Sequence, residues 1–160
     1  MPTPTYTPLA NVTLGSAATS VTFSSIPATY RDLIVVHSGL LTSGGQEIRL
    51  RYNGDSGSSY SYVEMTGTGS SATSSTSSSM TYAYGGLVYT TVANSIVQIM
   101  DYSATDKHKT GLTRSNNSAN NVVAFAHRWA NTAAITSLEL SIGGNLWAAG
   151  ATFNLYGVIA

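Results

Sequence analysis

The sequence predicts an all-β fold, an antiparallel β-sandwich of the jelly-roll type with little or no helix. Three observations carry this prediction. Short segments alternate between apolar and polar residues, turn residues recur every 8–12 residues or so, as roughly expected for a sandwich, and helical periodicity over a dozen residues is found nowhere. The chain has 160 residues, which is enough for one domain with a substantial core.

Roughly eight to ten strands are expected at this spacing. The segments that fit are 12–14, 20–23, 32–40, 47–52, 60–65, 80–91, 95–102, 122–129, 135–142 and 151–158. The run at 32–40 is mostly apolar, the pattern of a strand buried on both faces. Residues 47–52 alternate, which places Ile48, Leu50 and Tyr52 on one face and charged residues on the other.

Two segments are expected to lie outside the strands, and an Asn-rich turn is expected at 115–121. Residues 1–10 are rich in Pro and Thr and are predicted to form an extended N-terminal arm, so that the sandwich domain covers 11–160. Residues 67–79 are almost entirely Gly, Ser and Thr and are predicted to form a solvated surface loop of this domain. The N-terminus has neither the basic nor the apolar region of a signal peptide.

Charge is scarce in this chain. Charged residues make up 9% of the sequence and the formal net charge is zero, against about 25% charged residues in an average domain. A chain without a basic patch is not expected to bind nucleic acid, and no apolar run is long enough for a membrane partner. Because neutral polar groups are cheaper to bury than ions, strands covered with Ser, Thr, Asn and Tyr favour a protein that packs into an assembly.

The motifs that could carry catalysis have simpler interpretations. Residues 54–57 spell the nucleophile phrase of chymotrypsin-like proteases, but the chain is too short for that fold. Together with Asn53, they are predicted to form the turn that ends strand 47–52. No catalytic residue and no cofactor is expected, and an enzyme is the least favoured class.

A metal site is not expected either. His37, His108 and His127 lie far apart in the sequence, and convergence of His37 and His127 across strands is the one arrangement left open. His37 and His127 are expected to be hydrogen-bonded core or rim residues, and His108 an exposed loop residue. Asp55, Asp101 and Asp106 could supply oxygen ligands to Ca²⁺, but no loop has the dense acidic alternation of a strong site.

Aromatic pairs carry the main alternative function. Tyr60 with Tyr62 and Tyr82 with Tyr84 stand two residues apart in expected strands, and two tryptophans accompany them. Aromatic rings on a sandwich face can stack on sugars, so a module that binds a host-surface glycan remains open. The same pairs equally fit a core or a subunit interface, where aromatic residues are enriched.

Several blocks of the chain resemble small virion-associated proteins of tailed bacteriophages. They are VTFSSIPATYRDL at 21–33, RYNGD at 51–55 with YSY at 60–62, RWANTAAITS at 128–137 and GATFNLYGV at 150–158. The resemblance implies a β-sandwich on the outer surface of the phage particle. It also implies a non-enzymatic role in a head decoration (cement) protein or a tail-associated module.

From this resemblance we expect a homotrimer bound to the major capsid protein, which stabilises the assembled head by binding it and not its parts. The alternative places the chain in a tail or fibre and gives it a host glycan as ligand. The expected subunit or capsid contacts are the N-terminal arm and the aromatic residues: Pro2, Pro4, Tyr6, Pro8, Tyr82, Tyr84, Trp129 and Trp147.

Overall fold

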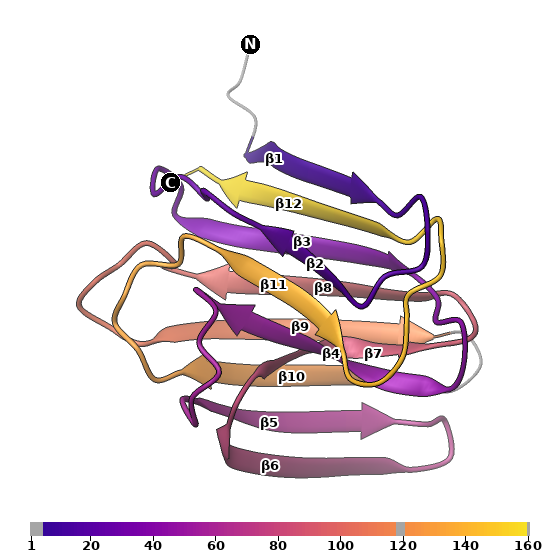
Figure 1. Cartoon of the computed structure of the whole chain (residues 1–160). Helices are drawn as coiled ribbons and strands as arrows, with labels where there is room; N and C mark the ends of the chain where they lie inside the picture. Colours follow the sequence, from indigo (N-terminus) through magenta and orange to yellow (C-terminus); the bar gives the residue numbers. More distant parts are fainter. Residues whose placement is uncertain (1–4, 118–120, 160) are drawn as a thin grey trace.

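The computed structural model describes residues 5–117 and 121–159, and these fold into two antiparallel β-sheets packed face to face (Figure 1). The strands are β1 (Tyr6–Thr13), β2 (Ser20–Phe23), β3 (Asp32–Gly39), β4 (Gly45–Tyr52), β5 (Tyr60–Gly67), β6 (Ala72–Met80), β7 (Ala83–Tyr89), β8 (Ala93–Met100), β9 (Lys109–Asn117), β10 (Val122–Trp129), β11 (Leu138–Ile142) and β12 (Thr152–Val158). The predicted β-sandwich is confirmed. Within the described ranges no helix could span a membrane.

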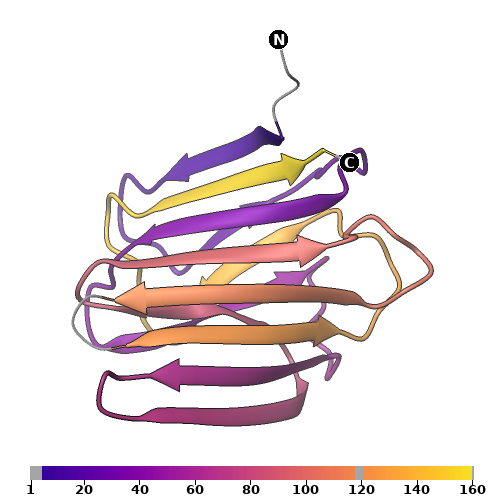
Figure 2. The same cartoon turned by 180° about the vertical axis from the view of Figure 1, so that it is seen from behind.

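The two sheets differ in size. The larger has eight strands in the order β1-β12-β3-β8-β9-β10-β5-β6, and the smaller has four in the order β2-β11-β4-β7. Figure 2 shows the eight-stranded sheet from the side that the small sheet does not cover. β5 and β6 extend beyond the small sheet at one end (Figure 1). One broad face of the molecule is therefore made by the eight-stranded sheet alone.

The core lies between the sheets and follows the alternation of the sequence. Ile48, Leu50 and Tyr52 are fully buried, as predicted, and their counterparts on β12 are Phe153 and Leu155. At about 25 cal/mol per Å² of apolar surface, burial of such side chains is the main stabilising contribution. The alternation predicted the core side of these strands correctly because their apolar residues lie on one face and their polar residues on the other.

The N-terminal arm predicted at 1–10 is wrong over the part that the structure describes. Tyr6–Thr13 is strand β1, paired antiparallel with β12 at the edge of the large sheet. Pro8 is tolerated because an edge strand can do without one N–H, and a bulge between Pro8 and Ala10 shifts the register. Pro2 and Pro4 lie outside the described residues.

The surface loop predicted at 67–79 is also wrong, because most of it is a strand. Ala72–Met80 forms β6 and pairs with β5, and only a short turn around Thr68–Ser71 separates the two strands. Side chains add to the ladder, since Thr76 Oγ1 donates to Tyr62 O (2.9 Å) and Ser75 Oγ donates to Glu64 Oε2 (3.1 Å). The segment is nonetheless exposed, because nothing packs over most of its side chains.

Strand β9 has inverted polarity and was missed by the sequence prediction, which placed an Asn-rich turn at 115–121. Its buried side carries polar residues, among them Thr113 and Ser115, whereas Leu112 on its other side is exposed. Thr113 Oγ1 donates to Tyr84 O (2.9 Å), and Ser115 Oγ donates to Leu87 O and accepts from its N–H. These hydroxyls satisfy backbone groups of β7, the strand at the edge of the small sheet.

Candidate interaction surface on the eight-stranded sheet

The face of the eight-stranded sheet that is turned away from the small sheet is built from cross-strand rows. In one row Ile34, Gln98, Leu112, Ala126 and Val63 are successive partners across β3, β8, β9, β10 and β5. In the next row the corresponding partners are Val36, Ile96, Arg114, Ala124 and Met65. These ten residues, with Val122 and Arg128 of β10, are called the outer face below.

The outer face is apolar and exposed. Val63, Met65, Leu112 and Val122 are 52%, 62%, 51% and 63% exposed. A hollow of about 470 Å³ lies over the two rows and is lined in part by Tyr6 of β1. Monomeric proteins rarely expose contiguous apolar patches of more than a few hundred Å², and larger ones mark sites of interaction.

Arg114 and Arg128 are the cations of the outer face. Neither guanidinium forms an ion pair or a hydrogen bond with the part of the chain that the structure describes. No exposed carboxylate lies in the two rows. The face therefore presents apolar side chains together with two unneutralised positive charges.

The opposite face of the molecule, on the small sheet, has a different character. Arg49 pairs with Glu47 (2.9 Å) and Arg51 with Glu139 (3.7 Å). Partial burial acts to raise the pKa of Glu47, but a backbone hydrogen bond to its carboxylate, together with the hydrogen bond and the Coulombic attraction of Arg49, holds that pKa below its usual value. The charges of these four residues are therefore neutralised within the chain.

The predicted tryptophan anchors are wrong. Trp129 and Trp147 are 1% and 0% exposed, so both belong to the core of this chain and cannot reach a partner in this fold. Trp147 packs edge-on against Phe153, with ring centroids 4.8 Å apart. The large apolar area of an indole favours the core as strongly as it favours an interface, and spacing in the sequence does not distinguish the two.

The predicted tyrosine contacts lie mostly inside the chain. Tyr82 is half-buried, donates a hydrogen bond to Glu47 (3.2 Å) and lies under the guanidinium of Arg49 (4.7 Å to the ring centroid). Tyr84 stacks on Phe125, with centroids 5.0 Å apart and planes at 9°. By contrast, Tyr6 is 55% exposed, and Pro8 is exposed on the same strand.

The sequence reasoning did not identify the outer face. Val63 and Met65 could have been identified from the sequence, because they alternate with the tyrosines of the expected strand 60–65. Tyr60 is buried and Tyr62 half-buried, so Val63 and Met65 lie on the opposite, exposed side. Leu112 and Arg114 gave no signal, because the polar side of β9 is the buried one. Leu112 and Arg114 are exposed because β9 pairs with β8 and β10 in a register that turns its polar side toward the small sheet.

The 53–57 segment is a structural turn, as predicted. Asp55 N–H donates to Tyr52 O (2.9 Å), and the Asp55 carboxylate accepts from Gly57 N–H (2.8 Å) and from Trp129 Nε1–H (2.6 Å). The indole hydrogen bond is the main reason that the pKa of Asp55 lies below its usual value. The carboxylate of Asp55, the residue next to Ser56, is thus engaged with a core tryptophan.

His37 and His127 do not converge. They lie on β3 and β10, three strand positions apart in the large sheet, which corresponds to about 14 Å across the strands. They are also displaced along the strands, because the residue of β10 in the row of His37 is Val123. Burial lowers the pKa of each to about 4, because the low-dielectric core disfavours the charged ring. His127 Nε2 hydrogen-bonds the hydroxyl of Tyr52 (2.6 Å). Both ring nitrogens of His37 are buried and have no hydrogen-bond partner among residues 5–117 and 121–159, so the prediction of a hydrogen-bonded His37 is wrong.

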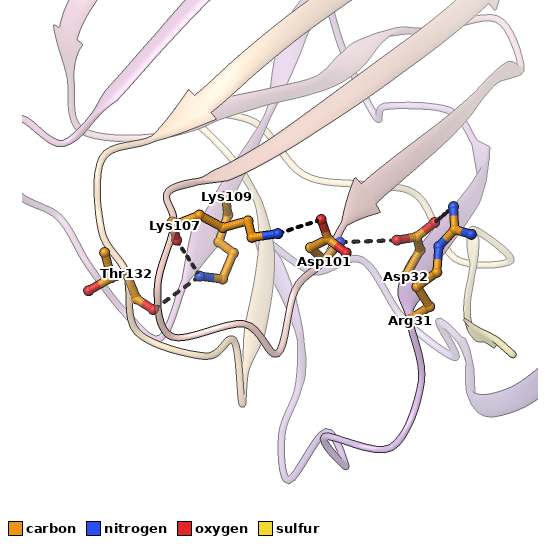
Figure 3. Close-up of polar contacts among 6 residues, drawn as sticks. All are labelled: Arg31, Asp32, Asp101, Lys107, Lys109 and Thr132. Carbon is orange, nitrogen blue, oxygen red and sulfur yellow. Dashed lines mark hydrogen bonds and ion pairs between the residues drawn. The ribbon is translucent and has the colours of Figure 1, made fainter. Parts of the chain in front are cut away.

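His108 is exposed, as expected. Near it, at one end of the sandwich, the candidate cation ligand Asp101 already has a positive partner (Figure 3). Asp101 Oδ2 lies 3.2 Å from Lys107 Nζ, and Asp101 N–H donates to the buried carboxylate of Asp32 (3.0 Å). Lys109 Nζ is buried and donates to the carbonyls of Lys107 and Thr132, and burial lowers its pKa. Within residues 5–117 and 121–159, no group of three His, Asp or Glu side chains could hold a metal ion.

Comparison with known proteins adds only distant similarity of fold. No protein-family model matches the chain, and no curated protein does. Among solved structures, the chain is similar to the exo-inulinase from Aspergillus awamori, with a TM-score of 0.45 and 9% identity, covering 96% of this chain and 29% of that one.

It is also similar to the alginate lyase Aly36B in complex with an alginate tetrasaccharide, with a TM-score of 0.40 and 13% identity. That match covers 92% of this chain and 78% of the lyase. The chain spans less than a third of the inulinase. At such TM-scores these similarities carry no argument about function.

Proposed function

We propose that this chain is a non-enzymatic structural protein of a phage virion, a decoration protein that binds the assembled head through the outer face. The single observation that carries the proposal is the contrast between the two broad faces. The small sheet neutralises its charges internally, whereas the outer face leaves Leu112, Val63, Met65 and two arginines exposed. The phage setting comes from the resemblance of blocks 21–33, 51–55 with 60–62, 128–137 and 150–158.

The chemistry of the outer face suits a protein surface. Burial of its apolar side chains would drive association, since the hydrophobic contribution scales with the apolar area removed from water. Carboxylates of the partner, here the major capsid protein, would face Arg114 and Arg128, because an unpaired buried guanidinium is costly. With only two charges involved, binding should depend weakly on salt.

The alternative function, binding of a host glycan, depended on exposed aromatic rings, and the fold buries most of them. Sugar stacking needs exposed rings, and both tryptophans, Tyr60 and Phe125 are buried while Tyr62 and Tyr84 contact each other at 4.6 Å. Of the aromatic residues in the described part of the chain, Tyr6 alone is largely exposed. One ring is a poor platform for an oligosaccharide.

The proposal is tested by co-sedimentation of the purified protein with decoration-free heads of the phage whose genome encodes it and, in parallel, with host cells. We expect saturable binding to heads at a fixed stoichiometry, little changed between low and high salt, and no binding to cells. Binding to cells that free glycan competes away would contradict the proposal and would place the chain in the tail.

A further inference from the structure

The edges of the two sheets are protected unequally. An edge strand presents unpaired N–H and C=O groups, and proteins usually blunt it with proline, charge, a bulge, short length or a covering segment. In the large sheet β1 has Pro8 and a bulge. In the small sheet β2 has only four residues, and side chains of β9 hydrogen-bond the backbone of β7.

β6 has none of these protections. It is nine residues long, contains neither proline nor a charged residue, and pairs with β5 on one side only in the part of the chain that the structure describes. Its one irregularity lies at its end, where the register shifts between Tyr60 and Tyr62 of β5, so that Ala72–Ser77 is a regular strand with a free edge. Six such residues could form about six further hydrogen bonds with an added antiparallel strand.

We infer that β6 is a self-association edge, which pairs antiparallel with β6 of a second copy of this chain around a two-fold axis. Directly opposed residues of antiparallel strands carry their side chains on the same face, so the axis lies at a residue that faces its own copy, which is Ser74 or Ser75 in the middle of the regular part. The side chains there are all small and nearly all hydroxyl-bearing, so self-pairing sets Ser and Thr opposite one another, a favourable cross-strand combination. A two-fold contact uses the same surface on both copies and closes on itself.

Charge does not oppose this pairing. The nearest charged side chain is Glu64 on β5, which accepts hydrogen bonds from Thr66 and Ser75 of its own chain. In the pair, the two copies of Glu64 would be separated by three strand spacings, about 14 Å. That distance exceeds the Debye length of about 8 Å at physiological salt.

Self-pairing would also extend the outer face. Val63 and Met65 lie one strand away from β6, with Thr76 and Ser74 as their partners. Joining two copies at β6 therefore brings the two outer faces side by side in one sixteen-stranded sheet, twice the eight strands of one copy. The inference itself does not depend on the proposed function, because the second copy is the only partner it needs.

The test is the mass of the purified chain by sedimentation velocity and light scattering across a concentration series. We expect a reversible dimer and, on dilution, increasing hydrogen exchange of those amides of Ala72–Ser77 that point away from β5. Ser74→Lys places two ammonium groups near the axis and should weaken the dimer about tenfold or more. Thr13→Lys, an exposed position on the β1 edge of the same sheet, is the matched control and should leave the dimer unchanged.

Three results would overturn the inference. A monomer at about 100 µM, well above the roughly micromolar range of weak specific contacts, would show that the edge is unpaired. A trimer, as implied by the phage resemblance, would exclude an isologous β6 contact. A dimer that Ser74→Lys leaves intact, or that Thr13→Lys dissociates, would place the contact elsewhere.

Discussion

Mild acid should destabilise this protein through its two buried histidines. His37 and His127 each have a pKa of about 4 in the fold, against 6.5 for an exposed imidazole. Between pH 4 and 6.5, roughly, the two imidazoles bind protons in the unfolded chain but stay largely neutral in the folded chain. Stability is therefore fully present above pH 6.5 or so and falls as the pH drops toward 4.

The size of the effect follows from the two pKa values. At pH 5 each histidine removes about 2 kcal/mol relative to pH 7.5, and the pair removes about 4 kcal/mol. That is a large part of the 5–15 kcal/mol or so by which domains are stable. The carboxylates of Glu47 and Asp55 have lowered pKa values and stay ionised in this range, so they add little above pH 5.

The assay is urea unfolding at pH 7.5, 6.5, 5.5 and 5.0, followed by tryptophan fluorescence. His37→Phe and His37→Asn both remove one titrating ring and should halve the loss between pH 7.5 and 5, whatever they do to stability at pH 7.5. His108→Gln, in an exposed loop, should leave the full loss. A wild-type loss below about 1 kcal/mol, or an unchanged loss in both His37 variants, would refute the assignment of proton linkage to these residues.

Three further substitutions test the fold by urea unfolding. Asn53→Ala removes side-chain hydrogen bonds to three backbone groups of 134–137 and puts alanine at φ 54°, so about 3 kcal/mol should be lost, and Asn53→Asp should lose less. Gly111→Ala would bring a methyl group within 2.4 Å of the His127 ring and should lower the free energy of unfolding by about 2 kcal/mol. Its control is Gly67→Ala, where a methyl group meets nothing within 4 Å and stability should not change. Trp129→Phe removes the 2.6 Å bond to the carboxylate of the 53–57 turn and should cost about 1–3 kcal/mol. Each contact would be contradicted by its own result. These results are an Asn53→Ala variant as stable as the wild type, equal losses of stability in the two glycine variants, and a Trp129→Phe variant as stable as the wild type.

The sequence predicted the sandwich where one face of a strand is apolar. The alternation at 47–52 identified the core face of β4, and the 53–55 turn was correct down to its role at the strand end. Both features are local, because alternation and turn chemistry are set by neighbouring residues.

Prediction failed where tertiary contacts replace the local pattern. β6 has hydroxyl residues on both faces and is held by pairing with β5, while β9 buries its polar side against the backbone of β7. The outer face was hidden for the same reason, since Leu112 stands on a strand that the hydropathy pattern does not reveal. Trp129 and Trp147 were misassigned because the same apolar area fits a core and an interface.

The central claim is that the outer face of the eight-stranded sheet binds the head. It is tested most directly by the affinity of Leu112→Glu for decoration-free heads, measured beside Ser20→Glu. Both positions are exposed, and both changes add one negative charge, but Ser20 lies on β2 of the small sheet. The account predicts binding at least about tenfold weaker for Leu112→Glu and unchanged for Ser20→Glu, with both variants as stable as the wild type. Unchanged binding of Leu112→Glu, or a loss confined to Ser20→Glu, would contradict it.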